Sequence, residues 1–509
     1  MPDLNENTRR IARNTMMLYI RMLFMMLLGL FTSRIVLEAL GENDYGIYNV
    51  VGGIVAMFTM ISGSLTTAVT RFITFELGKG SRAQMSKVYS TSLMIMCLLS
   101  VAVVLMAEPA GLWFIDNRMT IDPARIPAAR WVLHFSLLAF VINLMSVPQM
   151  ALITAHEKMS AYAYIGILDG VLRFVTALLI SRCGTDRLVL YAMLMTASVL
   201  IVRMAYSMYC RRSFPESAFR PVFELPLLKE MFSFAGWGFF GSMSGILRDQ
   251  GGNILVNIFS GPAVNAARAV AVQLNSAVQS FVTNFMTAVN PQITKSYASG
   301  DHEYMFSLMR KASRMSFYLL FILALPVLFN TEYLLGIWLK EVPEHSAAFV
   351  RLFLVFTLSE SISQPLITSM FATGKIRNYQ LVVGGLQLLN LPVSYVFLKA
   401  GAMPEVTVLV AIAVSQICLW ARLFMLHRMI GLNVPAFLRR VYFNVLFVAA
   451  VAFILPYVVT LIPAHGFAGF AVNASVCVIS AFCSIFFVGC SSDERKSAIA
   501  FVKRRLNLR

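Results

Sequence analysis

The feature that most constrains this chain is a series of long apolar segments that recurs from one end of the sequence to the other. Each holds about 20 residues, enough for a helix to cross a hydrocarbon core of roughly 30 Å. The runs are too long for barrel strands and lack a two-residue alternation, whereas helices close their backbone hydrogen bonds internally. We therefore predict an all-α polytopic membrane protein. Its fourteen spans are centred near residues 25, 58, 98, 140, 170, 198, 245, 275, 321, 359, 387, 417, 450 and 478.

Composition agrees with this class, because 58% of the residues are hydrophobic and only 13% are charged. A water-soluble core of this length could not hide so much apolar side chain. The first apolar run, residues 14–37, is too long for a cleaved signal peptide and contains Arg21 and Arg34, so we expect it to be the first span. The seven cysteines lack metal-ligand spacing and are expected to pack as small apolar residues. We expect neither a metal nor a cofactor.

The net charge of +17 is distributed unevenly over the predicted topology. When the connections are numbered alternately, the two termini and the even-numbered connections hold 27 of the 42 Lys and Arg residues, and the opposite side holds 7. The positive-inside rule then places both termini in the cytoplasm, with an even number of spans. Topology and attraction to anionic lipid headgroups account for the basic excess, so membrane lipids rather than nucleic acid are the expected partners.

The sequence also repeats itself. With a shift of 220, residues 67–85 match residues 287–305 at 7 of 19 positions without a gap. Further matches occur at shifts of 217, including Pro148 with Pro365, and of 219, including Arg203 with Arg422. A nearly constant offset predicts two six-helix lobes of the same topology, a known transporter plan. The predicted parts are lobes 1–215 and 230–432, a cytoplasmic linker 216–229, two further helices in 433–490, and a basic cytoplasmic tail 491–509.

Four stretches resemble a known family: LGENDYGIYNVVGGIVAMF (40–58), RFITFELGKG (71–80), GPAVNAARAVAVQLN (261–275) and LLGIWLKEVP (334–343). They are similar to the polysaccharide-exporting branch of the MATE-like MOP exporters, and most of all to Wzx-type O-antigen flippases. The resemblance implies a V-shaped, two-lobed protein of the bacterial inner membrane. It would carry an undecaprenyl-pyrophosphate-linked oligosaccharide from the cytoplasmic to the periplasmic leaflet, possible further partners being polysaccharide polymerase and assembly proteins.

Charged residues inside the spans are the candidates for function, because a charge at mid-bilayer costs about 2.5 to 3.5 kcal/mol and usually faces a bundle interior or a wet cavity. Arg248 and Asp249 stand side by side in an apolar helix, about 100° apart, so we expect them not to pair with each other. Arg268 in the next span could approach the same region. Guanidinium groups bind phosphate bidentately, so we expect Arg248, Arg268, Arg21 and Arg34 to hold the pyrophosphate. For Arg21, which lies about seven residues inside the first span, the alternative is a side chain that reaches the headgroups.

A polar stripe accompanies these arginines, since Asp249, Asn253 and Asn257 follow at four-residue steps. Asp169 and Arg173 form an i,i+4 pair, which could be structural. Glu360, Asp249 and Asp169 are the candidates for coupling to protons or sodium, although each could instead neutralise an arginine.

Three other span arginines have a simpler interpretation. Arg203, Arg351 and Arg422 lie near helix ends, where a long side chain can reach the headgroups, so we expect them to be interfacial anchors. Arg34 has Glu38 one turn onward, which could satisfy both charges.

Two features suggest bending. Segment 236–252 contains six glycines, which loosen a helix or allow close packing, and the matched prolines 148 and 365 predict equivalent kinks.

Other function classes are less well supported. A multidrug antiporter needs an acidic cavity, whereas arginines outnumber acids in these spans. A glycan polymerase or ligase needs a catalytic site, and the chain has no DxD, no HExxH and no long outer loop. There is also no GxxxxGK[ST] phosphate loop, so we do not expect ATP hydrolysis or any other enzyme activity. A scaffold for glycan assembly remains an alternative.

Overall fold

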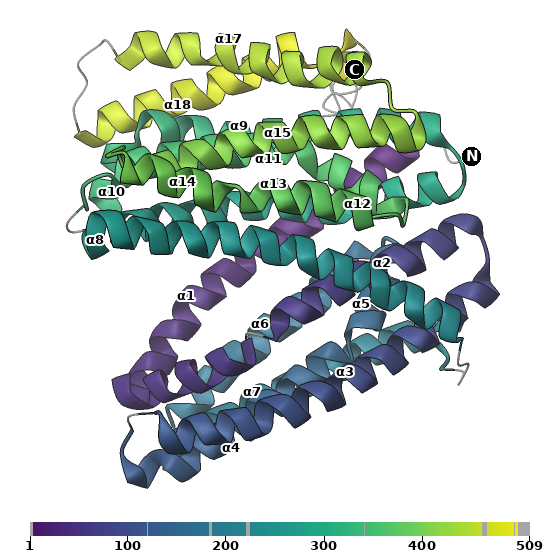
Figure 1. Ribbon diagram of the computed structural model, residues 1–509, viewed down its shortest axis with the longest axis vertical. Helices are drawn as coiled ribbons and strands as arrows, with labels where there is room; N and C mark the ends of the chain where they lie inside the picture. The colour runs from purple at the N-terminus through teal and green to yellow at the C-terminus, as the bar shows by residue number, and fades with distance from the viewer. Residues whose placement is uncertain are drawn as a thin grey trace, which may run out of the picture. The chain divides into compact units, whose positions relative to one another are not determined.

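The computed structural model describes residues 4–56, 58–119, 121–182, 186–219, 224–339, 342–460, 466–492 and 494–496. Linker residues 220–223, Cys183 and tail residues 497–509 lie outside this part. All regular structure in the described part is helical (Figure 1). The predicted all-α class is confirmed.

The first half of the chain forms α1 (Leu4–Ala56), α2 (Thr59–Lys79), α3 (Arg82–Asn117), α4 (Ile126–Leu144), α5 (Val147–Ala155), α6 (Met159–Ile180), α7 (Arg187–Ser213) and α8 (Leu225–Ala298). The second half forms α9 (His302–Phe329), α10 (Thr331–Trp338), α11 (Ser346–Ala372), α12 (Arg377–Tyr379), α13 (Gly385–Leu388), α14 (Asn390–Lys399), α15 (Val406–Ile430), α16 (Val434–Phe437), α17 (Phe443–Thr460) and α18 (Gly466–Ser484). Short 3₁₀ segments are η1 (Pro123–Arg125) and η2 (Pro215–Ser217), and π-helical segments are η3 (Gln380–Gly384), η4 (Leu438–Tyr442) and η5 (Ile485–Gly489).

Twelve helical stretches of the described chain are long and apolar enough to cross a membrane. One of them, α8, has 74 residues, and at 1.5 Å per residue it would be about 110 Å long, more than three bilayer cores. Its kink at Gly261 divides it into two span-length helices. Residues 42–56 and 59–79 are not among the twelve, and in the second of these segments Arg71, Glu76 and several hydroxyl side chains lower the hydropathy. The predicted fourteen is reached only by counting α8 twice and including this polar segment.

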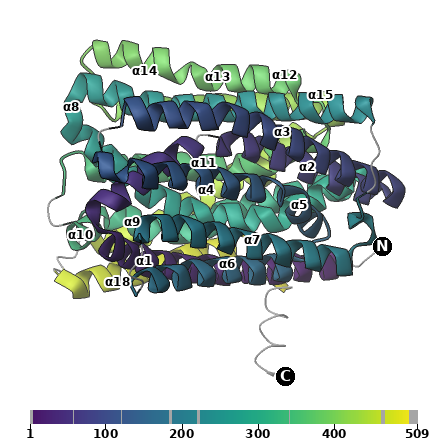
Figure 2. The ribbon, with the colours of Figure 1, turned by 90° about the horizontal axis from the view of Figure 1, so that it is seen from below.

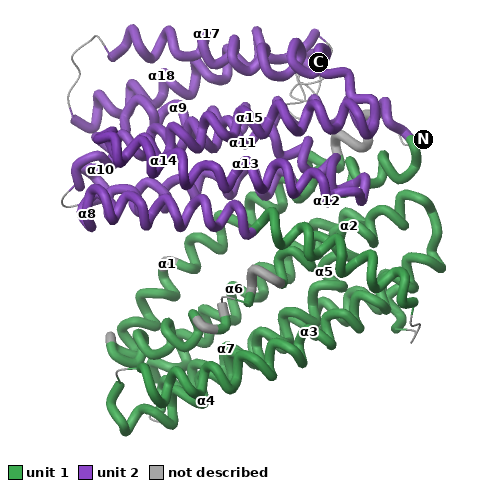
Figure 3. The backbone as a smooth tube through the Cα atoms, viewed as in Figure 1, with its two compact units in different colours: residues 1–242, 287–300 green, residues 243–286, 301–509 purple. Residues whose placement is uncertain are grey.

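The chain divides into two compact units (Figure 3). Unit 1 comprises residues 1–242 and 287–300, and unit 2 comprises residues 243–286 and 301–509. Two of the three changes of unit fall within α8 and the third follows it after Gly300, so none lies in the predicted linker. The lobes 1–215 and 230–432 were defined by sequence similarity rather than by packing, so their boundaries stay a prediction.

Within unit 1, α1 packs along α6, and α4 packs against α7 and α3. Within unit 2, α11 packs against both α9 and α15. The helices α17 and α18 pack against each other at one side of this unit (Figure 1). The consecutive segments α12, η3, α13 and α14 form one interrupted helical span, seen at the top of Figure 2.

The backbone repeats itself at the same offsets as the sequence. Gly41 and Gly261, 220 residues apart, both kink their helices with φ of 75° and 81°. Gly80 and Gly300, again 220 apart, both have a positive φ. Such angles are open to glycine and strained for other residues. The internal repeat therefore extends to the conformation of individual turns.

The two predicted sources of bending behave differently. Pro148 lies in the first turn of α5, just after the break that separates α4 from α5, whereas Pro365 lies inside α11, which continues to Ala372. The helix therefore ends beside Pro148 but continues through Pro365, and equivalent kinks stay a prediction for the second copy. The glycines of 236–252 lie in unbroken helix, and two of them allow close packing, since a Cβ at Gly251 would lie 2.3 Å from Leu391 and one at Gly252 would lie 2.8 Å from Arg268.

Candidate functional site

Arg248 and Asp249 pair with each other in unit 2. Arg248 Nε donates to Asp249 Oδ1 at 2.8 Å, and Nη2 donates to Oδ2 at 3.2 Å. The prediction that these neighbours would not pair is wrong, because long side chains can turn towards each other although their Cβ atoms diverge. The Arg248 side chain is 16% exposed, and its guanidinium lies 5.0 Å from the centre of the Phe356 ring. Asp249 is 58% exposed, so the pair has a buried cation and an open anion.

Arg268 does approach the same region, as predicted. It comes from the second part of α8, is 5% exposed, and lies over the Phe353 ring. Its Nη1 donates to Asn253 Oδ1 and, at 3.3 Å, to the backbone carbonyl of Asp249. Both acceptors are neutral oxygens, and the buried Nε has no hydrogen-bond partner in the described chain. Arg268 is thus a desolvated cation without a directly bonded carboxylate.

A second charged group lies around Glu360, one helical turn after Phe356 on α11. Glu360 accepts a hydrogen bond of 2.5 Å from Ser415 Oγ and lies 3.8 Å from Arg422 Nη1. Its charge also acts on Arg248. Arg422 is 1% exposed and donates from Nε to Tyr379 Oη at 3.4 Å. The prediction that Arg422 is an interfacial anchor is therefore wrong, because its side chain points into the helix bundle instead of reaching the surface.

We name these five charged residues the arginine cluster: Arg248, Asp249, Arg268, Glu360 and Arg422. The cluster contains three arginines and two carboxylates, so its net charge is +1. Asn253 belongs to its hydrogen-bond network, whereas Asn257 is exposed and bonds to no described residue. Only part of the predicted polar stripe therefore supports the cluster.

The remaining predicted site residues lie in unit 1. Arg21 lies 4.6 Å from the centre of the Tyr162 ring, and its Nε is only 2.1 Å from where a Cβ would stand at Gly166. Only glycine leaves room there for the guanidinium. Arg34 is exposed and forms no ion pair with Glu38 in the described structure. The expected i,i+4 pair of Asp169 and Arg173 is present at 3.0 Å.

The two remaining predicted anchors differ. Arg351 is 43% exposed and pairs with Glu332 at 2.8 Å, in agreement with an interfacial position. Arg203 is half-buried and reaches only the carbonyl of Ile142, at 3.4 Å.

A buried carboxylate centre at Glu157 in unit 1 was not among the residues predicted from the sequence. The Glu157 side chain is 1% exposed and accepts from Lys295 Nζ at 2.6 Å and from Gln292 Nε2 at 2.7 Å. Arg10 Nε lies 2.9 Å away, and Asn14 Nδ2 donates to the Glu157 backbone carbonyl at 3.2 Å. This Glu157 centre joins α1, the turn after α5, and the last turns of α8.

Glu157 also has an unfavourable backbone conformation, with φ of 58°. At the repeat offset of 217 its counterpart is Gly374, which has φ of 76°. A glutamate thus occupies a left-handed position at which the other copy has glycine, which costs roughly 1 to 2 kcal/mol. The repeat aligns Glu157 with Gly374 in the sequence, but the strain at Glu157 can be inferred only when both residues are known to have a positive φ. Strain of this kind marks candidate functional positions.

The fold matches that of solved transporters. A MATE protein in its bent conformation superposes with a TM-score of 0.71 at 13% identity, covering 85% of this chain and 96% of the other. An outward-facing MATE multidrug resistance transporter of the MOP superfamily gives 0.70 at 14% identity, covering 85% and 97%. A MOP superfamily transporter from Pyrococcus furiosus, described as having a binding pocket of reversed polarity, gives 0.68 at 13%, covering 84% and 96%. The protein therefore has the fold of MOP transporters.

Residues 11–297, more than half of the chain, match the polysaccharide biosynthesis protein family. The chain belongs to this family, whose fold and class indicate a transporter or flippase. It is 20% identical over 290 residues to the uncharacterized membrane protein EpsK of Bacillus subtilis (strain 168). That match spans 57% of this chain and 57% of the relative's length.

Proposed function

We propose that this protein is a flippase for undecaprenyl-pyrophosphate-linked oligosaccharide repeat units, used in O-antigen, capsule or exopolysaccharide synthesis. It acts in the bacterial cytoplasmic membrane, with both termini in the cytoplasm and the assembly proteins of the same glycan as partners. Family membership supports the glycan, and the transporter fold supports movement across the membrane. Neither identifies the lipid carrier, so that part depends on the charged residues.

The proposal depends mainly on one observation, that Arg268 is a buried cation with no directly bonded carboxylate. A guanidinium stays charged when desolvated and presents its N–H groups in a plane that suits phosphate oxygens. Arg268 is buried, has a free Nε, and is bonded only to neutral oxygens in the described structure. A diphosphate would supply the missing negative charge.

Arg248 plays a second, conditional role. It is already neutralised by Asp249, but that carboxylate is more than half exposed. A dianionic ligand bound at Arg268 repels Asp249 and competes with it for Arg248. Movement of Asp249 towards water then frees Arg248 for the ligand, and product release restores the ion pair. This exchange lets a cationic cavity bind and release its anion during alternating access.

The test is glycan export in cells that lack the native gene. Arg268→Gln keeps the polar contacts but removes the charge, so surface glycan should fall at least tenfold with normal protein in the membrane. Arg351→Gln is the matched control, because it removes a span arginine that is half-exposed and paired with Glu332. Normal export by Arg268→Gln would exclude Arg268 from the transport site.

The fold itself supports an alternative, a cation-coupled multidrug antiporter. Its required acids would be Asp249, Glu360 or Asp169, which are also the candidates for ion coupling in the flippase. Efflux of a cationic dye from vesicles, abolished by Asp249→Asn and unaffected by Arg268→Gln, would favour the antiporter. A polymerase or ligase is the less supported alternative.

A further inference from the structure

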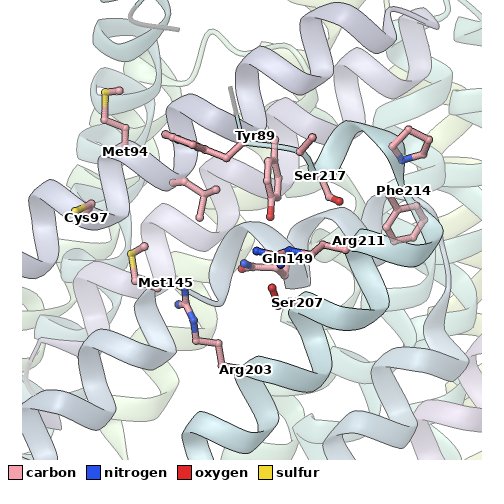
Figure 4. Close-up of a pocket in the computed structure, with 14 residues that line it drawn as sticks. Tyr89, Met94, Cys97, Met145, Gln149, Arg203, Ser207, Arg211, Phe214 and Ser217 are labelled. Atoms are coloured by element: carbon pink, nitrogen blue, oxygen red, sulfur yellow. The ribbon is translucent and has the colours of Figure 1, made fainter. Parts of the chain in front are cut away.

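A cavity of about 700 Å³ lies within unit 1 and shares no residue with the arginine cluster (Figure 4). It is lined by α3, α5, α7 and η2. Since η2 leads into the linker 216–229, the cavity lies at the end of the bundle that the charge bias predicts to be cytoplasmic. Its two walls differ in chemistry.

One wall is polar and cationic. Arg203, Ser207 and Arg211 follow at four-residue steps on α7, so they share one helix face. Figure 4 shows these side chains directed towards the same space as Tyr89 and Gln149. The charges of Arg203 and Arg211 both act on the Tyr89 hydroxyl. Neither arginine forms an ion pair with any carboxylate that the structure describes. Two cations therefore face one cavity without a counter-ion.

The other wall is apolar and continues onto the outer surface. Leu93, Met94, Cys97 and Met145 line the cavity. Further along α3, Leu98 is 53% exposed and Leu105 is 69% exposed, as is typical of residues that face acyl chains. The cavity is thus cationic at the predicted water side and apolar towards the membrane.

The internal repeat provides a comparison for Arg203. Its counterpart Arg422 is buried and is neutralised by Glu360. At the offset of 217 the position of Glu360 corresponds to Asn143, which is uncharged and adjacent to the Ile142 carbonyl that Arg203 contacts. The first copy therefore keeps the arginine but lacks the carboxylate. Its positive charge is directed to a cavity that an external anion can enter.

We propose that this cavity binds the phosphate headgroup of an anionic membrane phospholipid. The phosphate lies between Arg203 and Arg211, with Tyr89 and Ser207 as hydroxyl donors, and one acyl chain leaves along Leu93, Met94 and Cys97. Basic pockets between helices on the cytoplasmic side are suited to such headgroups, and guanidinium binds phosphate bidentately. This site is separate from the transport site, so it can be tested without any transport measurement.

The test uses the purified full-length protein in a neutral detergent, with thermal unfolding as the readout. Phosphatidylglycerol, phosphatidylcholine and inorganic phosphate are added separately. Phosphatidylglycerol should raise the melting temperature of the wild type. The variant Arg203→Gln/Arg211→Gln should bind it at least tenfold more weakly. Arg212→Gln is the matched control, because Arg212 has the same charge on the same helix end but does not line the cavity.

Asn143→Glu is a second, independent variant that restores the carboxylate of the other copy. It should also weaken phosphatidylglycerol binding, and Asn143 is exposed, so the fold should tolerate the change. Equal binding by wild type and both variants would overturn the proposal. So would an equal effect of phosphatidylcholine, which has no net charge, or an equal effect of inorganic phosphate, which would indicate a site for a free anion.

Discussion

At the scale of single residues, Glu157 combines a buried charge with a strained backbone. Its carboxylate is bonded to Lys295 and Gln292 and lies 2.9 Å from Arg10. Lys295 comes from the part of α8 that returns to unit 1. The strain is maintained because the bonds formed by the side chain offset it.

Substitutions at Glu157 separate these two effects. Glu157→Gln should destabilise the protein by about 1.5 to 3 kcal/mol, since it removes a charge-assisted hydrogen bond and leaves Lys295 without its carboxylate. Glu157→Gly and Glu157→Ala both remove the side-chain bonds, but only glycine tolerates φ of 58°. The glycine variant should therefore be the more stable by about 1 to 2 kcal/mol. Thermal unfolding of the purified protein measures all three, and equal melting of the alanine and glycine variants would contradict the left-handed turn.

Sequence reasoning at this scale identified residue types better than partners. Arg268 could be expected near Arg248 because the two residues lie in consecutive predicted spans. The ion pair of Arg248 with Asp249 depends on the side-chain rotamers of two adjacent residues. The pair of His156 with Glu216, at 2.6 Å, depends on the fold, which brings together residues 60 positions apart in the sequence. Periodicity contains no information on either.

At the scale of elements, two glycines determine where long helices turn. Gly261 has φ of 81° and ψ of 176°, a combination that is essentially restricted to glycine. Gly236 lies in regular helix of the same element, and no atom lies within 4 Å of where its Cβ would stand.

These two glycines give opposite predictions for the same substitution. Gly261→Ala should destabilise the protein by about 1 to 3 kcal/mol, because alanine is strained at the kink. Gly236→Ala should stabilise it by about 0.5 to 1 kcal/mol, because alanine loses less backbone entropy in a helix. Melting temperatures that move in the same direction for both variants would show that the kink at Gly261 is not as described.

Most elements were predictable because hydropathy and helix length are set by the bilayer. The exceptions are physical. Residues 59–79 were expected to belong to a span but are too polar to meet a hydropathy criterion, and they nevertheless form helix up to the cap at Gly80. The π-helical segments η3, η4 and η5 depend on tertiary packing and leave no periodic pattern. The glycines of 236–252 were expected to permit either bending or close packing, and the kink of α8 lies outside them, at Gly261.

At the scale of the whole molecule, the class of protein follows from three agreeing observations. Twelve helical stretches of the described chain are long and apolar enough to cross a membrane, the fold matches that of MOP transporters, and residues 11–297 match the polysaccharide biosynthesis family. The charge asymmetry adds a predicted orientation with both termini inside. What the sequence and the fold leave to experiment is the cargo, because a cationic cluster defines the charge of a ligand and not its sugar.

The most direct test is transfer of the proposed cargo by the purified protein. Undecaprenyl-pyrophosphate-linked oligosaccharide is incorporated into both leaflets of sealed vesicles, and a membrane-impermeant glycosidase digests the outer pool. With wild-type protein and with Arg351→Gln, the inner pool should become accessible and digestion should approach completion. With Arg268→Gln, digestion should stop near one half, as in vesicles without protein. Complete digestion with Arg268→Gln, or digestion stopped at one half with the wild type, would contradict the assignment of a flippase that binds its diphosphate through Arg268.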